Sequence, residues 1–407
     1  MSASGVMRRI LCIDIEGGYG GSSRSLYESL RHMDRTGLAI EVWCARAGPI
    51  QQRYAALGIP CRVIPNLPRF SALPRLSRNL LALALYFRAW LGSNDLRRDL
   101  LAAAQRADVI HLNHEALYGI GVWLRSQASR AAVTMHVRTI LPSGFVARWQ
   151  SRRMAAGSDA MVFITENEQM AFRRQVGGDV PTPGRVIFNI ATPVPAASPH
   201  PAIPRDGRLV VACLSNFAWI RGVDRLIDIA QALARRGRND VLFVQAGQIQ
   251  LPHSLPGVLG EVARRGGSLR DYAERMGVAD RMLFLGHVSE PETVLAASDL
   301  LAKPTREANP WGRDIIEALA AGRPVLTVGT YDRFVENGVT GILQPEFDAD
   351  LLAGHIAALA DDRSAIARMG KQAAMRVADL CDGPARASDL LAFWQMARDR
   401  AGRPPCP

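Results

Sequence analysis

The chain has 407 residues, of which 48% are hydrophobic and 21% are charged. This length predicts two domains or three, and the composition excludes a disordered, collagen-like or coiled-coil protein. Lysine and arginine outnumber aspartate and glutamate by 49 to 38, and only Lys303 and Lys371 are lysines. The single Gly-Lys pair, Gly370-Lys371, lacks the upstream glycine and the following Ser or Thr of a Walker loop. A P-loop nucleotidase is therefore excluded.

The six cysteines are scattered and form no Cys-x-x-Cys pair, which argues against a structural zinc site and favours a reducing compartment. The first apolar stretch meets Asp14 after a few residues, which is too short for a secretory signal. The longest apolar run, residues 80–87, is far below the ~18 residues of a membrane span. We therefore expect a cytoplasmic protein without a spanning helix.

Short apolar strands alternate with helical stretches in the first half of the chain. A glycine-rich loop, residues 17–21, follows the first strand and precedes a helix that begins near Ser22. Such alternation predicts a mostly parallel, doubly wound α/β sheet. The expected strands are residues 10–15, 40–44, 61–64, 109–112, 132–135 and 160–164.

Positive charge is concentrated in residues 62–153, the basic region, where fourteen arginines stand against four acidic residues. Within it we expect a helix that has Ser77 as N-cap and runs to Leu91, with leucines and aromatic residues between arginines. This composition suits a helix that lies on an anionic membrane surface. A solvated arginine-rich surface and a merely buried helix are the alternatives, and the sequence leaves both open.

A proline-rich stretch, residues 191–205, is predicted to be a linker. It separates a first Rossmann-like domain, residues 1–190, from a second, residues 206–384, in which the alternation restarts. Residues 385–407 are expected to form a helix that packs back on the first domain. The strands expected after the linker are residues 209–214, 241–244, 282–285, 300–303 and 324–328.

Two segments of the second half have the composition of a phosphate site. The first is the turn Ser-Asn-Phe-Ala-Trp-Ile-Arg-Gly, residues 215–222, between a strand and a helix. Helix-start amides and the Arg221 guanidinium can hold a diphosphate, because oriented donors and positive charge meet its oxygens together. A surface arginine before a helix is the structural alternative.

The second segment, residues 304–325, is expected to begin a helix close to Gly312. The amides of Gly312, Arg313 and Asp314 are then placed to bind an anion. Glu317 follows one turn later, and a carboxylate can accept hydrogen bonds from both hydroxyls of a ribose. The alternative is an amphipathic helix that ends at Gly322 and leaves Glu317 solvated.

This second segment resembles the retaining glycosyltransferases of family 4, which have the GT-B fold. Their motif is Pro-Ser-x-x-Glu-x-Phe-Gly-x-x-x-x-Glu-Ala-x-Ala-x-Gly-x-Pro-Val. The resemblance implies two Rossmann-like, doubly wound domains that face each other across a cleft. Matching positions are Pro304-Thr305, Gly312, Glu317-Ala318, Ala320, Gly322 and Pro324-Val325, with further matches in residues 187–189, 284–286 and 337–343.

Two positions depart from the family pattern. Asn309 stands where the first motif glutamate is expected, and the usual Arg/Lys pair of the diphosphate turn becomes Asn216 and Arg221. An amide can exchange hydrogen bonds with a sugar hydroxyl but adds no negative charge beside a developing positive sugar. Glu307 is a candidate substitute for that charge, and Arg313 for the missing cation. The departures affect donor identity and rate more than fold.

The resemblance also implies site residues in the first domain. Gly20 and Gly21 are expected to let the backbone approach the donor closely. His136 coincides with a family histidine placed near the transferred sugar, although a lone histidine after a strand is often structural. His114 and Arg138 are weaker candidates for contact with the acceptor.

Neither a metal nor a cofactor is expected beside the donor substrate. The Asp-x-Asp of the sequence, residues 348–350, lies at the expected start of a late helix, where acidic residues favour the helix dipole. The resemblance implies a metal-independent reaction in which helix amides and basic side chains bind the leaving diphosphate.

The sequence thus predicts a retaining glycosyltransferase that moves a sugar from a nucleotide-diphosphate sugar to a glycan or lipid-linked acceptor in bacterial surface polysaccharide assembly. We expect it in the cytoplasm, peripheral at the inner face of the plasma membrane through the basic region, and without nucleic-acid binding. The alternatives are a catalytically weakened or inactive GT-B scaffold and another GT-B enzyme, such as a sugar-nucleotide epimerase. The expected catalytic residues are His136, Arg221 and Glu317, and the donor-binding residues are Gly20, Gly21, Asn216, Arg221, Asn309, Gly312, Arg313, Asp314 and Glu317.

Overall fold

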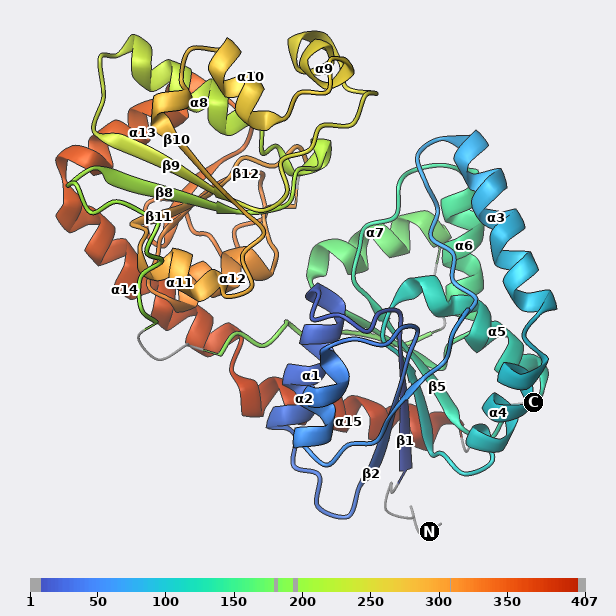
Figure 1. Ribbon diagram of the computed structural model, residues 1–407. Helices are drawn as coiled ribbons and strands as arrows, with labels where there is room; N and C mark the ends of the chain where they lie inside the picture. The colour runs from blue at the N-terminus through green and yellow to red at the C-terminus, as the bar shows by residue number, and fades with distance from the viewer. Residues whose placement is uncertain (1–8, 179–181, 193–196, 308, 402–407) are drawn as a thin grey trace. The chain divides into compact units, whose positions relative to one another are not determined.

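The computed structural model describes residues 9–178, 182–192, 197–307 and 309–401 and divides into two compact units (Figure 1). Unit 1 comprises the chain up to Ile190 together with the segment from Gly383 onward, and unit 2 runs from Ala191 to Asp382. Each unit is built around one β-sheet, and the strands of both sheets pair in parallel. The predicted α/β class is confirmed in both halves.

Unit 1 has a seven-stranded sheet in the order β3-β2-β1-β4-β5-β6-β7. The chain order reverses between β1 and β4, and open α/β sheets bind ligands outside the carboxyl ends of their strands at such a reversal. The strands are β1 (Arg9–Asp14), β2 (Ala39–Cys44), β3 (Cys61–Val63), β4 (Val109–Leu112), β5 (Ala132–Val137), β6 (Ala160–Phe163) and β7 (Gly184–Val186).

Helices cover both faces of this sheet, because successive strand residues point to opposite faces. Ile10 and Cys12 belong to the apolar cluster under α1, α2 and α15, whereas Leu11 and Ile13 belong to the cluster under α3 to α7. The helices are α1 (Gly21–His32), α2 (Ile50–Ala56), α3 (Leu76–Leu91), α4 (Asn94–Ala104), α5 (Tyr118–Ser126), α6 (Phe145–Ala156), α7 (Glu166–Val176) and α15 (Gly383–Ala401), with a 3₁₀ turn, η1 (Glu115–Leu117).

The C-terminal helix α15 is part of the unit 1 core, where it packs against α1, β4 and β5. Trp394 of this helix is completely buried, and its indole Nε1 donates a hydrogen bond to His111 Nδ1 at 3.2 Å. Gly383, at the start of α15, approaches His32 so closely that a Cβ there would lie 2.6 Å from the imidazole Nδ1. The apolar face under α1 and α2 is therefore completed by residues from the far end of the chain.

Unit 2 has a six-stranded sheet in the order β10-β9-β8-β11-β12-β13, which reverses between β8 and β11. Its strands are β8 (Leu209–Leu214), β9 (Val241–Ala246), β10 (Met282–Gly286), β11 (Leu300–Lys303), β12 (Val325–Val328) and β13 (Gly341–Gln344). Its helices are α8 (Arg225–Arg235), α9 (Gly257–Arg264), α10 (Leu269–Arg275), α11 (Pro291–Ala296), α12 (Arg313–Ala320), α13 (Ala349–Asp361) and α14 (Arg363–Leu380), with 3₁₀ turns η2 (Trp219–Arg221) and η3 (Ala279–Arg281). Within the described parts of the chain, no helix is both long and apolar enough to cross a bilayer.

The start of α3 corrects one expectation. Ser77 is not the N-cap, because the helix begins at Leu76 and Arg75 is the capping residue, with an extended backbone. The Asn79 side chain accepts a hydrogen bond from Leu73 N at 2.8 Å and donates one to Leu73 O at 2.7 Å. These bonds hold the segment before the helix against its first turn, so Ser77 already lies inside the helix.

Part of the predicted linker, residues 193–196, lies outside the described residues. The rest packs on unit 2. Ala191 N donates to Cys381 O at 3.3 Å, and His200 N donates to Thr293 O of α11 at 2.9 Å. Ile203 is buried. Much of this proline-rich stretch is thus bound to the surface of unit 2.

Replacing Trp394 by alanine is expected to lower the free energy of unfolding of unit 1 by about 3–5 kcal/mol, because it empties a buried aromatic position and removes the bond to His111. Chemical denaturation followed by circular dichroism measures the change. Met396→Ala on the same helix, at a side chain 38% exposed, is the matched control and is expected to cost less than about 1 kcal/mol. Equal losses in the two variants would contradict the placement of Trp394 in the core.

Candidate active site

In unit 2, the loops that follow β8 and β11 are joined at the carboxyl ends of the sheet. Arg306 donates from Nη1 and Nη2 to the two carboxylate oxygens of Asp224, at 2.8 and 2.6 Å, and its guanidinium lies 3.5 Å above the Trp219 ring. Gly222 approaches Pro304 so closely that a Cβ would lie 2.0 Å from the proline carbonyl oxygen. The two segments predicted to hold a diphosphate are therefore brought together by direct contacts.

The turn after β8 carries Arg221 and Asn216. Arg221 Nη1 donates to Ser215 Oγ at 3.2 Å. Asn216 Oδ1 accepts a hydrogen bond from Gln248 N at 2.8 Å, which braces this turn against the one after β9. Gln245 of β9 is buried, and its Nε2 donates to Ser215 O at 2.5 Å. Arg221 is thus held at the site, whereas the Asn216 carbonyl oxygen serves the local backbone.

The start of α12 is shaped by Gly312 and Lys303. Gly312 is the N-cap with φ +154°, a conformation that favours glycine. Lys303 Nζ donates to Asp314 Oδ1 at 2.7 Å and to Trp311 O at 3.0 Å. A Cβ on Gly312 would lie 2.5 Å from Nζ. Sequence reasoning noted how rare lysine is in the chain but assigned Lys303 no role.

Arg313 and Glu317 lie one turn apart on α12 and form an ion pair. Arg313 Nε and Nη2 are both 3.1 Å from Glu317 Oε1. The two side chains are 13% and 15% exposed. The carboxylate expected to bind a ribose is therefore held in place by its helix neighbour through one of its oxygens.

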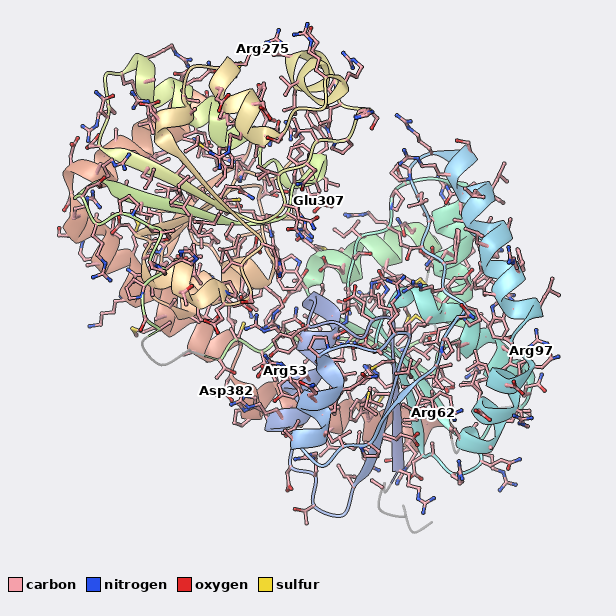
Figure 2. All side chains as sticks on the ribbon, viewed as in Figure 1. Arg53, Arg62, Arg97, Arg275, Glu307 and Asp382 are labelled. Carbon is pink, nitrogen blue, oxygen red and sulfur yellow. The ribbon has the colours of Figure 1, made fainter. Side chains whose placement is uncertain are left out.

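Glu307 lies at the edge of unit 2 near these groups and is labelled in Figure 2. Partial desolvation raises the pKa of its carboxyl, while the charges of Lys303 and Arg221 lower it. Asn309 follows closely, and its carbonyl oxygen accepts a hydrogen bond from Trp311 N at 2.8 Å. The charges of Lys303 and Arg221 therefore both act on the Glu307 carboxyl, two residues before the expected motif position.

In unit 1, polar side chains gather at the carboxyl ends of β1, β4 and β5. Asn113 Nδ2 donates to Asp14 Oδ1 at 3.1 Å, and Arg138 Nε donates to Asn113 O at 2.7 Å. Arg138 Nη2 lies 3.1 Å from His136 Nδ1, and Arg138 N donates to Glu115 Oε2 at 2.9 Å. The structure thus brings His136 and Arg138 together with three buried polar residues that the sequence did not single out.

His136 lies within β5, which continues to Val137, and not after the strand as expected. Its side chain is buried, and burial together with the Arg138 charge lowers the pKa of the ring well below its ordinary value. Because the Arg138 guanidinium donates toward Nδ1, the neutral ring carries its proton on Nε2. Within the described residues Nε2 has no hydrogen-bond partner. The ring is therefore a neutral donor for an oxygen atom.

The glycine loop before α1 is packed most closely at Gly17. Gly20 has extended backbone that any residue adopts, although a Cβ there would lie 2.6 Å from Glu16 Oε2, and a Cβ on Gly21 would meet open space. The tight position is Gly17, where a Cβ would lie 1.9 Å from a carbonyl oxygen of the loop after β2. Tyr19 lies under the guanidinium of Arg53, 3.8 Å from the ring centroid. Tyr19 and Gly17 fix the loop and leave space beside Gly21.

The candidate His114 and the Asp-x-Asp segment both make structural contacts. His114 is the N-cap of η1, where its Nδ1 accepts from Ala116 N at 3.1 Å. In the Asp-x-Asp segment, Asp348 caps α13 by accepting from Leu351 N at 3.0 Å, and Asp350 pairs with Arg235 at 3.0 Å.

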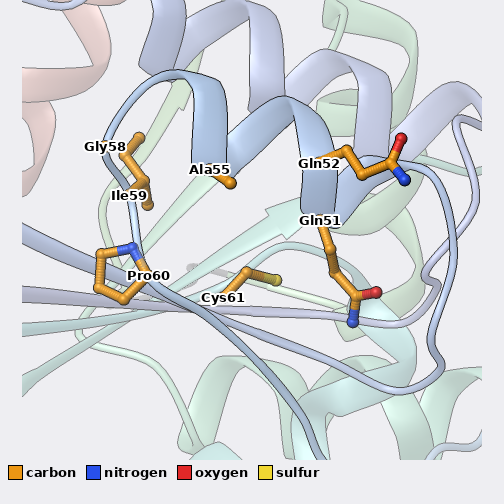
Figure 3. Close-up of a pocket in the computed structure, with 7 residues that line it drawn as sticks. All are labelled: Gln51, Gln52, Ala55, Gly58, Ile59, Pro60 and Cys61. Carbon is orange, nitrogen blue, oxygen red and sulfur yellow. The ribbon is translucent and has the colours of Figure 1, made fainter.

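A separate pocket of unit 1 runs along α2 beside the edge strand β3 (Figure 3). It contains none of the predicted site residues. The Cys61 Sγ lies 3.3 Å from Cys44 Sγ, and the five cysteines of the described chain are free thiols. The pocket is lined by Gln51, Gln52, Ala55, Gly58, Ile59, Pro60 and Cys61.

The fold and the position of the two polar clusters define the class of the protein. Each unit is a doubly wound α/β domain with polar residues at the switch point of its sheet. The crystal structure of HepE from Anabaena in complex with UDP and glucose is similar over 95% of this chain and 99% of that chain, with a TM-score of 0.72 and 21% identity. WaaG, a glycosyltransferase involved in lipopolysaccharide biosynthesis, is similar over 94% and 99%, with a TM-score of 0.64 and 17% identity. The fold is GT-B.

Sequence comparison identifies the family. Residues 20–189 match the model of the glycosyl transferase 4-like domain, and residues 208–362 match that of glycosyl transferases group 1. The chain belongs to this glycosyltransferase family. An α-D-kanosaminyltransferase of Streptomyces kanamyceticus is 26% identical over 56% of this chain and 58% of its own length. A D-inositol 3-phosphate glycosyltransferase of Nocardia farcinica is 28% identical over 62% and 56%. The matches span a little over half the length of these relatives.

The buried histidines make the stability of unit 1 depend on pH. Burial lowers the pKa of His111 to about 3, and it also lowers that of His136. The unfolded chain protonates both rings below about pH 6.5 and the folded chain does not, so stability is present above that pH and is lost as the pH falls. For His111 the loss is about 2 kcal/mol between pH 7 and pH 5.

His111→Gln is therefore expected to reduce by about 2 kcal/mol the difference in free energy of unfolding between pH 7 and pH 5, measured by urea denaturation at both values. His253→Gln, at an exposed histidine of unit 2, is the control and is expected to leave that difference unchanged. An unaltered difference in the His111 variant would show that this ring is protonated in the folded protein.

Proposed function

We propose that the chain transfers a sugar from a nucleotide-diphosphate sugar to a glycan or lipid-linked acceptor with retention of configuration. The observation that carries the proposal is the direct contact between the loop after β8, which carries Arg221, and the loop after β11, which leads into α12, in a chain of the glycosyltransferase family. Support for the donor class comes from HepE, whose crystal structure contains UDP and glucose. The surface-polysaccharide setting is supported by the family and by the basic region.

In the proposed donor site, positively charged groups bind the diphosphate of the nucleotide-sugar, and hydrogen bonds hold its ribose. Arg221 and the first amides of α12 bind the diphosphate, and their positive charge stabilises it as the glycosidic bond breaks. Glu317 accepts hydrogen bonds from the ribose hydroxyls, and Arg313 keeps its carboxylate oriented. In unit 1, the His136 Nε2 proton is available to an oxygen atom of a ligand.

The reaction needs no covalent attachment to the protein. The bond from the sugar C1 to the phosphate oxygen breaks, and a bond from C1 to the acceptor oxygen forms on the same face. The acceptor hydroxyl proton passes to the departing phosphate. The chain's own residues then act by positioning and by electrostatic stabilisation.

An inactive scaffold of the same fold is the second candidate. Asn216 favours it, because this side chain offers no cation and its carbonyl oxygen is bonded to Gln248 N. The position of Glu307 favours activity instead, because the charges of Lys303 and Arg221 both lower the pKa of its carboxyl and so favour the negative charge there.

Glu317→Ala is expected to lower the release of nucleoside diphosphate from the preferred donor at least about 10-fold, because it removes the ribose acceptor. A coupled assay with UDP-, GDP- and ADP-sugars measures the release. Glu261→Ala is the matched control and is expected to leave the rate unchanged. Glu261 lies on α9 and forms an ion pair at 2.8 Å with Arg275 of α10, which is labelled in Figure 2. Absence of release by the unmodified protein with every donor would support the scaffold.

We propose further that α3 docks unit 1 on an anionic membrane surface. Its inward side holds the buried residues Asn79 and Tyr86. Its outward side carries leucines where a solvent-facing helix normally has polar residues. These are Leu80, Leu81, Leu85 and Leu91, with Phe87 beside them, all between 55% and 80% exposed.

The charge beside these leucines indicates the partner. Arg75, Arg78 and Arg88 are exposed on the same helix or at its cap, and the surrounding basic region has a strong excess of arginine. A second copy of the chain would bring like charges together at this face, whereas an anionic leaflet complements them and accepts the leucines at its interface. An anionic bilayer therefore fits the helix better than self-association.

Replacing Leu81 and Leu85 together by glutamate is expected to reduce co-sedimentation with vesicles of mixed phosphatidylcholine and phosphatidylglycerol at least about 10-fold, because it removes apolar insertion and adds negative charge. Binding of the unmodified protein is expected to weaken with salt. Leu351→Glu, at a leucine of α13 that is 53% exposed, is the control. Equal binding to neutral vesicles, or a double variant that still binds, would contradict the proposal.

A further inference from the structure

Lys303 is chemically exceptional in a chain that uses arginine for nearly all of its 49 cationic side chains. It is the last residue of β11, the strand that pairs with β8 where the order of the unit 2 sheet reverses. The other lysine, Lys371, is exposed on α14. The structure thus places one lysine at the carboxyl end of the strands, where open α/β sheets bind their ligands, and one on the surface.

The Lys303 ammonium is held in place with bonding capacity to spare. The side chain is 14% exposed, and Nζ donates to Asp314 Oδ1 and to Trp311 O. An ammonium carries three hydrogens, and within the described residues two of them have acceptors. Gly312 leaves room for the ammonium, since a Cβ there would lie 2.5 Å from it. The charge is therefore fixed against the first turn of α12.

Lys303, at the end of β11, and Arg221, in the turn after β8, act electrostatically on the same two groups. Cys213 is buried near the end of β8, and the charges of both cations lower the pKa of its thiol against the larger effect of burial. Both also lower the pKa of the Glu307 carboxyl. The same two cations thus act on a thiol of strand β8 and on a carboxyl of the loop after β11. A diphosphate carries charge on both phosphates, and a pair of cations matches it better than one.

The position that lacks a cation strengthens this assignment. Asn216 follows β8 in the proposed diphosphate turn, and its carbonyl oxygen is bonded to Gln248 N. Arg313, the substitute considered from the sequence, is paired with Glu317. Lys303 is the further cation that reaches the start of α12, and it does so from β11 instead of from the turn after β8.

We infer that Lys303 is a donor-binding residue whose ammonium, together with Arg221, binds the diphosphate of the nucleotide-sugar at the start of α12. The inference rests on the proposed function. Asp314 holds the ammonium when no ligand is present, and the remaining hydrogen is directed to a phosphate oxygen on binding. Because the ammonium contacts the phosphates and not the nucleoside, its removal is expected to weaken binding of the diphosphate more than binding of the nucleoside.

The test compares Lys303→Met with Lys371→Met, which removes the only other lysine. Calorimetric titration with UDP, GDP and ADP first identifies the nucleotide that the unmodified protein binds. Lys303→Met is expected to weaken binding of that diphosphate about 10- to 100-fold and binding of the nucleoside without phosphate less than about 3-fold. Lys371→Met is expected to bind both as the unmodified protein does. Equal loss of both ligands, or no loss of either, would overturn the inference.

A second measurement uses the unmodified protein, so that a folding defect of the variant cannot decide the result. An N-hydroxysuccinimide ester acylates both lysines, and peptide mass spectrometry follows each rate. The bound diphosphate is expected to slow acylation of Lys303 at least about 5-fold, by excluding the reagent from the ammonium, and to leave Lys371 unchanged. Binding of the diphosphate without protection of Lys303 overturns the inference and leaves the proposed function standing. Failure of all three diphosphates to bind the unmodified protein would overturn both.

Discussion

The candidate donor site depends on the ion pair between Arg306 and Asp224. Its bidentate geometry fixes the loop after β11 against the start of α8, and the Trp219 ring covers the guanidinium. A pair of this kind contributes geometry more than stability, because desolvation offsets much of the attraction. What it secures is the distance between two loops that are more than 80 residues apart in the chain. These loops carry Arg221 and Glu307, and the charges of Arg221 and Lys303 both lower the pKa of the Glu307 carboxyl.

Much of the architecture follows from the sequence, because parallel strands buried on both faces read as short apolar runs. The strands at Val109–Leu112, Leu209–Leu214 and Leu300–Lys303 have the bounds expected from that pattern. The strands Gly184–Val186 and Gly341–Gln344 were missed. Both lie at a sheet edge, and both begin with glycine, which weakens the strand signal. The predicted start of α3 was wrong, because Asn79 inside the helix, and not Ser77 at its N-cap, forms the hydrogen bonds to the preceding segment.

The residues of the site were predictable only as far as motifs reach. Arg221 and Glu317 stand in recognisable segments. The contacts that hold other residues of the two polar clusters, such as Asp224 with Arg306 or Asn113 with Arg138, join residues that are distant in sequence and follow no local pattern. At Asn216 and Asn309 two charges expected from the motif are absent, and Lys303 and Glu307, the charged residues considered in their place, stand outside the motif positions. The composition pointed to Lys303 where motif spacing did not, because lysine is rare in the sequence and Lys303 stands at the end of a predicted strand.

The return of α15 to unit 1 has a consequence for biosynthesis. During translation the first 190 residues leave the ribosome long before Gly383 to Ala401 are made, so the face that Trp394 closes stays open until α15 has been synthesised. Unit 2 is continuous in sequence, and its strands β8 to β13 have been made by then. Unit 2 is therefore free to reach its native form while unit 1 still lacks α15.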